Sequence, residues 1–256
     1  MDDQSTEPPR SEAPETNEAV LEAGRQPVHQ PIFNVPPAIM ASLALLTGIF
    51  LVQTYLLSPQ VSEAFVVRFG FSPVRYVVPF ADQGLEWLWS PVTYSFLHGG
   101  IEHIVFNSLW LAAFGTPVLR RIGTPRFVIF WIGSAAAGAL LHALLNWGQP
   151  TLMIGASAVV SALMGAACRF AFARPSGHSH ISDAAPPRLS VLGALSQRTV
   201  LVFTGAWLFG NLAIAVGLPL FGDLGAAVAW DAHIGGFLFG FLLFGLFDPV
   251  PAPAAR

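Results

Sequence analysis

Six long apolar stretches constrain this chain more than any other feature of its sequence. Each is long enough to cross the hydrocarbon core of a bilayer, which is about 30 Å thick. They cover residues 36–57, 92–118, 127–147, 152–173, 199–221 and 224–247. The short alternating segments typical of a β-barrel are missing, and a backbone in lipid must satisfy its own hydrogen bonds. We therefore expect an all-α, polytopic membrane protein with six transmembrane helices.

The composition agrees with a membrane protein and excludes other classes. Hydrophobic residues make up 54% of the 256 residues and charged residues only 11%, whereas a soluble domain carries about 25% charge. No basic patch is present, so nucleic acid is not an expected partner. The single cysteine, Cys168, lies in an apolar stretch and excludes a disulfide framework.

The polar ends of the chain set the expected domain layout. Residues 1–35 are acidic and rich in proline, and we expect a disordered cytoplasmic tail there. A basic region followed by an apolar core, the mark of a signal peptide, is missing from this stretch. Residues 36–248 form the expected six-helix membrane domain, and residues 249–256 a short cytoplasmic tail.

The arginines predict the orientation of the helices. They concentrate in residues 119–126, in residues 169–198 and in both tails. Positive residues favour the cytoplasmic side, so we expect both termini there. The connection over residues 58–91 then faces outward. It is long, apolar and tryptophan-bearing, which predicts a position in the outer interface of the membrane.

Polar side chains within apolar stretches are costly in lipid and indicate a functional site. In the expected spans these residues are His98, Glu102, His103, Asn107, His142, Ser157, Ser161, Asp231 and His233. We assign His142 a structural role, because no motif surrounds it.

Three of these residues are predicted to share one depth. With a rise of about 1.5 Å per residue, His103, Ser157 and His233 lie roughly 25, 18 and 22 Å from the charged residues at the inner ends of their spans. Those reference residues are Arg120, Arg169 and Asp248. The three polar residues therefore fall in the outer half of the membrane.

The chemistry of these residues suggests a nucleophile and a base. Ser157 falls at the expected N-terminus of the fourth helix, where backbone N–H groups are unpaired and the helix dipole favours an anion. His233 at matching depth is the candidate base. Asp231 points to nearly the opposite face of its helix, so we expect a Ser–His dyad without a carboxylate. His103 and Asn107 share a helix face.

Three motifs, "HGGIEHIVFN", "GAS…ALMGA" and "AHIGGFLFG", resemble those of the rhomboid intramembrane serine proteases, and the resemblance covers residues 36–248. It implies a six-helix bundle whose water-filled cavity opens outward. It also implies Ser157 as the nucleophile and His233 as the base. His103, Asn107 and the Ser157 N–H would form the oxyanion hole.

The resemblance also extends to supporting residues and partners. Gly155 belongs to the serine motif, and Gly236 and Gly240 form a small-xxx-small pair that would let the sixth helix approach the fourth. His98 could line the cavity or bind a nearby carbonyl that holds the 58–91 connection, and we favour the structural role. Family members cut single-pass membrane proteins near the outer surface, without a metal or cofactor. The expected location is a bacterial inner membrane, and no oligomeric state is implied.

Two residues depart from the family pattern. Ala158 stands where the family often has glycine after the serine. Ser161 stands where it commonly has an aromatic ring stacked on the catalytic histidine. Without that ring, the imidazole of His233 needs other support, for which we considered a hydrogen bond from Ser161 or packing by a neighbouring aromatic residue.

Other functions fit the sequence less well. A zinc protease needs HExxH, which is missing. An aspartyl type needs paired aspartates, one of them in GxGD, and "LFGD" around Asp223 lacks the first glycine. A transporter would show symmetric halves, and none is visible. A catalytically inactive relative that binds membrane clients is the remaining alternative, although such proteins typically lose the serine or the histidine.

Overall fold

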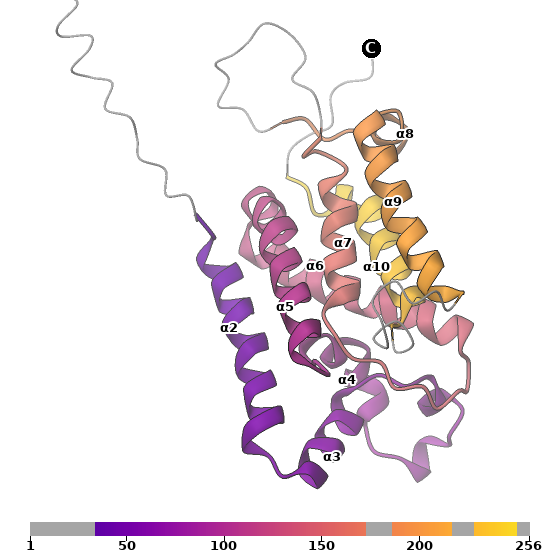
Figure 1. Ribbon diagram of the computed structural model, residues 1–256. Coiled ribbons are helices and arrows are strands. Elements are labelled where there is room, and N and C mark those ends of the chain that lie inside the picture. Colours follow the sequence, from indigo (N-terminus) through magenta and orange to yellow (C-terminus); the bar gives the residue numbers. More distant parts are fainter. Residues whose placement is uncertain (1–33, 173–185, 217–227, 250–256) are drawn as a thin grey trace, which may run out of the picture. The chain divides into compact units, whose positions relative to one another are not determined.

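The computed structural model describes residues 34–172, 186–216 and 228–249. The predicted tails, 1–35 and 249–256, lie almost wholly outside these residues. Apart from one isolated β-bridge, the regular structure of the described part is helical, which confirms the all-α prediction. Its α-helices are α2 (Pro37–Leu51), α3 (Pro59–Phe69), α4 (Glu86–Thr93), α5 (Ile101–Trp110), α6 (Thr116–Leu145), α7 (Ser157–Ala167), α8 (Val191–Leu195), α9 (Arg198–Ala215) and α10 (Trp230–Leu243) (Figure 1).

Short helical turns of other types extend several of these elements. Two π-helices, η1 (Val52–Leu56) and η5 (Leu111–Gly115), continue α2 and join α5 to α6. The 3₁₀ turns are η2 (Pro73–Tyr76), η3 (Phe80–Asp82), η4 (Tyr94–Phe96) and η7 (Phe244–Leu246). Pro37 and Pro59 stand at the starts of α2 and α3, where a missing N–H costs no hydrogen bond.

Three helical stretches are long and apolar enough to cross a membrane: Pro37–Leu56, Ile101–Leu145 and Arg198–Ala215. Within the second, Gly123 has φ 76° and ψ 163°, a conformation that breaks the helical path and that only glycine adopts easily. Residues 101–122 and 124–145 are therefore two separate helical segments, called the helical arms below. Two shorter apolar helices, Ser157–Ala167 and Trp230–Leu246, complete the set.

Several predicted boundaries are wrong. The sequence predicts the second span from residue 92, but α5 begins only at Ile101, and residues 97–100 are irregular. His98 therefore lies in a loop before the helix. The fourth was expected from residue 152, whereas residues 152–156 are not helical. Hydropathy reports burial in an apolar setting, and these segments are apolar without being helical. The predicted ends at 217–221 and 224–227 lie outside the described residues.

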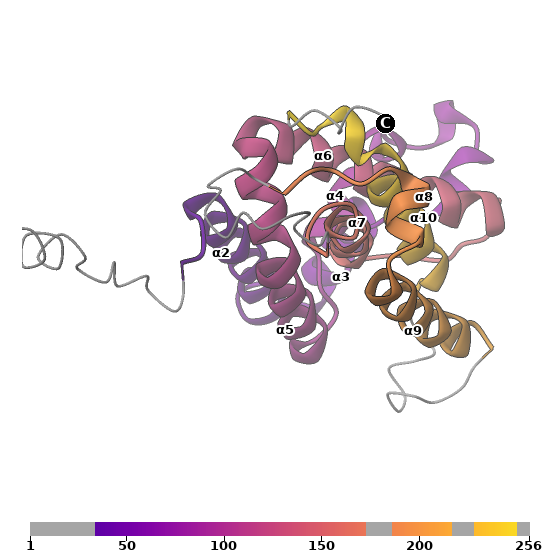
Figure 2. The same cartoon turned by 90° about the horizontal axis from the view of Figure 1, so that it is seen from above.

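The short helix α7 is the centre of the bundle. Viewed along its axis, it is ringed by α5, α6, α9 and α10 (Figure 2). Every residue from Ala158 to Ala167 is buried. Its 11 residues rise only about 16 Å, roughly half the thickness of a bilayer core. A helix this short can keep its first residue well below a membrane surface.

The predicted close approach of the fourth and sixth helices is confirmed. A Cβ at Gly236 would lie 2.0 Å from the backbone oxygen of Ala158, and one at Gly240 would lie 1.8 Å from that of Ala162. On the α7 side, a Cβ at Gly165 would lie 2.5 Å from the Phe237 oxygen. The backbones of α7 and α10 therefore touch along their length, as small residues permit.

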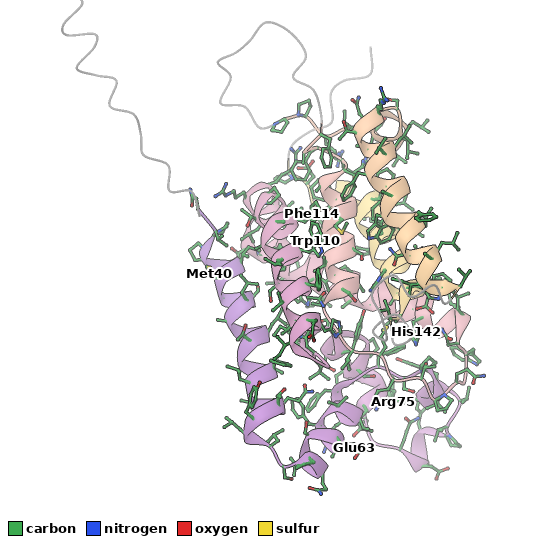
Figure 3. The ribbon with its side chains drawn as sticks, in the orientation of Figure 1. Met40, Glu63, Arg75, Trp110, Phe114 and His142 are labelled. Carbon is green, nitrogen blue, oxygen red and sulfur yellow. The ribbon has the colours of Figure 1, made fainter. Side chains whose placement is uncertain are left out.

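The segment between α2 and α4 packs beneath the bundle in the view of Figure 1. Glu63 of α3 and Arg75 of η2 mark this layer in Figure 3. The hydroxyl of Thr93 donates to the Phe69 oxygen at 2.7 Å, which ties α4 to the end of α3. Phe71 and Met153 exchange two backbone hydrogen bonds of 3.0 and 2.8 Å. This bridge joins the layer to the chain that leads into α7.

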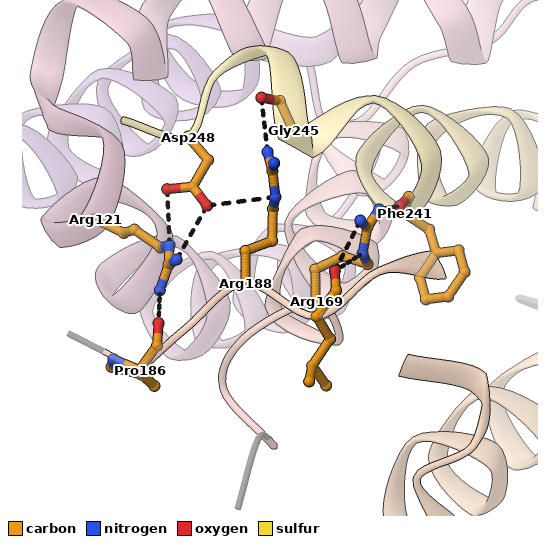
Figure 4. Close-up of polar contacts among 8 residues, drawn as sticks. Arg121, Arg169, Pro186, Arg188, Phe241, Gly245 and Asp248 are labelled. Carbon is orange, nitrogen blue, oxygen red and sulfur yellow. Dashed lines mark hydrogen bonds and ion pairs between the residues drawn. The ribbon is translucent and has the colours of Figure 1, made fainter. Parts of the chain in front are cut away.

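The opposite end of the bundle is held by buried charges (Figure 4). Arg121 of α6 makes two hydrogen bonds to the Asp248 carboxylate, of 2.9 and 3.0 Å, and both side chains are almost fully buried. Arg188 approaches the same carboxylate at 3.9 Å. Arg169 donates to the oxygens of Leu189 and Phe241. Buried arginines of α6 and of the chain that follows α7 thus hold the C-terminal part of α10 and η7.

Replacing Asp248 with asparagine is expected to destabilise this end of the bundle. The amide is neutral and can accept only one of the two Arg121 bonds, so we expect a loss of about 1–3 kcal/mol in unfolding free energy. Thermal unfolding in detergent measures it. Asp82→Asn is the matched control, because Asp82 is exposed in η3. Equal melting of the two variants would show that the buried pair contributes nothing.

Candidate active site

Ser157 is the first residue of α7 and follows a sharp turn. Gly155 has φ 121°, and its N–H donates to the Tyr94 oxygen at 2.9 Å. Ala156 occupies the N-cap, and no side chain caps the helix. The serine hydroxyl is thus not a capping group, although its position at the helix start is as predicted. The first backbone N–H groups of α7 have no partner within the helix. Ser157 itself is only partly buried.

The imidazole of His103 lies directly against this turn. A Cβ at Gly155 would lie 2.5 Å from His103 Nε2 and 3.7 Å from Ser157 Oγ, so only glycine fits between them. The Gly99 N–H donates to His103 Nδ1 at 3.5 Å. An accepting Nδ1 places the proton of the neutral ring on Nε2. His103 therefore presents an N–H donor toward the start of α7.

His233 reaches the same region from the first turn of α10. Gly236, one turn later, packs its backbone on Ala158, the residue after the serine. Because Ala158 directly follows Ser157, this contact brings the turn of α10 that bears His233 beside the serine. No hydrogen bond joins Ser157 to His233 among the described residues, and such bonds are often long in unliganded enzymes. The structure thus brings Ser157, Gly155, His103 and His233 into one region.

Asn107 and His98 stand slightly apart from this group. Asn107 is buried one turn further along α5, and its Nδ2 donates to the His103 oxygen at 2.9 Å. His98 is fully buried in the loop before α5, with its ring edge-on to His103 and the centroids 5.0 Å apart. Its backbone oxygen accepts a hydrogen bond of 3.3 Å from Gln53. Both residues therefore contact His103, Asn107 through the backbone oxygen and His98 through the ring.

Asp231 belongs to a separate buried cluster. Its Oδ1 pairs with His142 Nδ1 at 2.8 Å, and its Oδ2 accepts from Asn146 Nδ2 at 2.7 Å. The other nitrogen of His142 contacts the Thr151 hydroxyl at 3.0 Å. These bonds tie the start of α10 to α6, where His142 is labelled in Figure 3. As expected, the carboxylate of Asp231 is not paired with His233.

Sequence reasoning missed Asn211. Its Oδ1 lies 2.8 Å from His233 Nδ1. The sequence suggests two supports for the imidazole, Ser161 and an aromatic ring. Among the described residues, the hydrogen-bond partner of its Nδ1 is Asn211 instead. The available signal was the presence of one amide in the otherwise apolar stretch of residues 199–221.

The arrangement offers the parts that acyl transfer needs: a hydroxyl, an imidazole supported on its far nitrogen, and N–H donors at a helix start. Among the residues that the structure describes, no three His, Cys, Asp or Glu side chains converge in the manner of metal ligands.

Comparison with known proteins identifies the family. The model of the Rhomboid domain matches residues 86–248, from α4 to the end of η7 and the following turn. The chain is 31% identical over 156 residues to the rhomboid protease GlpG of Serratia proteamaculans, covering 61% of this chain and 47% of that protein. For the GlpG proteins of Pectobacterium atrosepticum and Yersinia pestis, the identities are 27% over 175 residues and 30% over 170 residues.

Those two matches cover 68% and 64% of this chain and 54% and 50% of the relatives. The chain therefore spans about half the length of the curated relatives it matches. The family model covers well over half of the chain, and the helices it covers carry all three sequence motifs. The chain belongs to the rhomboid family.

Proposed function

We propose that this protein, an integral membrane protein by its family and its apolar helices, is an intramembrane serine endopeptidase. The observation that carries the proposal is the position of Ser157, at the start of a short buried helix, next to the His103 imidazole and beside the turn of α10 that bears His233. Ser157 is the nucleophile and His233 the general base. The names of the relatives, rhomboid protease GlpG, support the same activity.

The proposed reaction follows from the positions of the donors and acceptors. His233 Nε2 takes the proton of Ser157 Oγ as the oxygen attacks the scissile carbonyl. The negative charge on the carbonyl oxygen is stabilised by the Ser157 backbone N–H and by His103 Nε2–H. Asn107 supports His103 through its backbone. His233 then protonates the leaving amine, and water hydrolyses the acyl-enzyme.

The proposed substrates are single-pass membrane proteins, cut in or near their transmembrane segments. The serine sits roughly 18 Å from Arg169, which supports cleavage in the outer half of the bilayer. We further propose six spans within residues 36–248, an inner membrane location and cytoplasmic tails at both ends. The helical arms 101–122 and 124–145 support the count of six.

The proposal is tested with the purified full-length chain in detergent. It is incubated with several model transmembrane substrates whose helices are locally unstable, and the products are resolved by mass spectrometry. Cleavage within or beside the apolar segment supports the proposal. Binding of all substrates without any cleavage would instead favour the client-binding alternative.

The proposed orientation predicts a cytoplasmic C-terminus. After Arg256, a fused green fluorescent protein is expected to fluoresce and a fused alkaline phosphatase to be inactive. The reason is that the arginines of residues 119–126 and 169–198 favour the cytoplasmic side. Paired fusions of alkaline phosphatase and green fluorescent protein measure it. A reporter fused within residues 58–91 is the internal control and should read external. A reversed pair of readings would contradict the orientation and the depth comparison together.

A further inference from the structure

One polar side chain of α9 reaches the imidazole of His233. Asn211 Oδ1 lies 2.8 Å from His233 Nδ1. Asn211 is only 6% exposed, whereas the apolar helix that carries it is mostly exposed, with 17% of its span buried. An amide turned inward from such a helix has its polar group matched to a partner in the bundle.

The orientation of the Asn211 amide is defined by a second bond. Its Nδ2 donates to the Trp207 oxygen at 2.9 Å, one turn earlier in α9. With the nitrogen so engaged, the oxygen faces His233 and can only accept. The proton of the neutral imidazole then resides on Nδ1, and Nε2 keeps its lone pair. This is the tautomer that a base facing a serine hydroxyl requires.

We infer that Asn211 is the positioning residue of His233, holding the imidazole in orientation and with Nε2 free to accept the proton of Ser157. The inference rests on the proposed function, in which His233 is the base. The Ser–His pair then becomes a Ser–His–Asn arrangement. A neutral amide suits this place, because a buried carboxylate beside lipid carries a large desolvation cost.

The inference explains how the imidazole of His233 is supported although neither a carboxylate nor an aromatic ring does so. Asp231 is engaged with His142 and Asn146. Ser161 stands where the family commonly has a ring that stacks on the histidine. Asn211 supplies from α9 the support that this ring would give from α7.

A purely structural role for Asn211, as a link between α9 and α10, predicts different results. The same two helices are also joined by the Trp207 ring, which stacks on Phe237 with centroids 4.5 Å apart. Trp207→Leu removes this ring contact but keeps the backbone oxygen that accepts from Asn211 Nδ2, so the amide keeps its orientation toward the imidazole. It serves as the matched control for variants of Asn211.

The experiment compares Asn211→Leu, Asn211→Asp and Trp207→Leu in the full chain. Asn211→Leu removes the acceptor at similar volume. We expect it to lower kcat about a hundredfold, the lower end of what a general base contributes, with little change in KM. Labelling of Ser157 by a fluorophosphonate should slow by a similar factor. Asn211→Asp keeps an acceptor beside Nδ1 and should retain more of the rate than Asn211→Leu, with a lower melting temperature because the buried carboxylate is costly to desolvate. Trp207→Leu should lower the melting temperature but not kcat.

A second measurement does not need activity. In protein labelled with ¹⁵N-histidine, the imidazole shifts of His233 should report the Nδ1–H tautomer in the wild type and a mixture in Asn211→Leu. An unchanged tautomer in Asn211→Leu, or an equal loss of kcat in Trp207→Leu, would overturn the inference. If the tautomer differs between the wild type and Asn211→Leu as expected, but the wild type neither cleaves a substrate nor reacts with the fluorophosphonate, the position of Asn211 is supported. Only the proposed function is then contradicted.

Discussion

Ser157→Ala is expected to lower the rate of substrate cleavage by about a millionfold, the loss seen when a serine protease of another fold loses its nucleophile. That factor corresponds to about 8 kcal/mol of transition-state stabilisation. The reason is that the acyl-enzyme can no longer form, and the remaining N–H donors at the start of α7 stabilise only the uncatalysed attack of water. Single-turnover cleavage of a transmembrane substrate in detergent measures the loss.

Two further variants make this result specific. His233→Ala is expected to lose nearly as much, because residues that act as a unit are not additive. Ser42→Ala is the matched control, since the Ser42 hydroxyl donates within its own helix, to the Ala38 oxygen at 2.9 Å, and has no other hydrogen-bond partner among the described residues. It should cleave at the wild-type rate. Cleavage by Ser157→Ala at more than a small residual rate would rule out the serine mechanism.

Gly240→Ala is expected to separate α7 from α10 and to remove both stability and activity. Its Cβ would lie 1.8 Å from the Ala162 oxygen and 2.6 Å from the Ala162 carbonyl carbon. Both are backbone atoms, so no side chain can move aside. We expect a loss of about 3 kcal/mol, the upper end for overpacking. A shift of about 1 Å at a catalytic group costs on the order of a hundredfold in rate. Thermal unfolding and kcat measure the two effects.

The matched control is Gly205→Ala in α9, where an added Cβ meets nothing within 4 Å. It should melt at or slightly above the wild-type temperature, because alanine favours a helix over glycine by about 1 kcal/mol. If Gly240→Ala melted and cleaved as Gly205→Ala does, the close backbone contact that aligns the two helices would be contradicted.

The sequence predicted the helical class and the α7–α10 contact because both depend on local patterns. Apolar runs of bilayer length can satisfy their backbone only as helices, and glycines spaced by four residues lie on one face of α10. The position of Ser157 at a helix start is also confirmed. The catalytic roles of Ser157, His233, His103 and Asn107 stay predictions until they are tested.

The errors lie where apolar chain is not helical. Residues 97–100 and 152–156 were assigned to spans on hydropathy, yet both are irregular. Their backbones are satisfied by distant partners. The Gly155 N–H bonds to the Tyr94 oxygen, and Met153 pairs with Phe71. Hydropathy cannot register bonds between segments so far apart in sequence.

By itself, the sequence predicted apolar helices, a serine and two histidines at one depth, and small residues where two of the helices touch. These predictions follow from the spacing of the small residues, from the cost of backbone groups without hydrogen bonds in lipid, and from the rise per residue of an α-helix. Only the tertiary structure decided which group faces the far nitrogen of His233. Asn211 lies 22 residues earlier on another helix, and its amide is set against the imidazole by the packing of α9 on α10, a contact that no local pattern encodes.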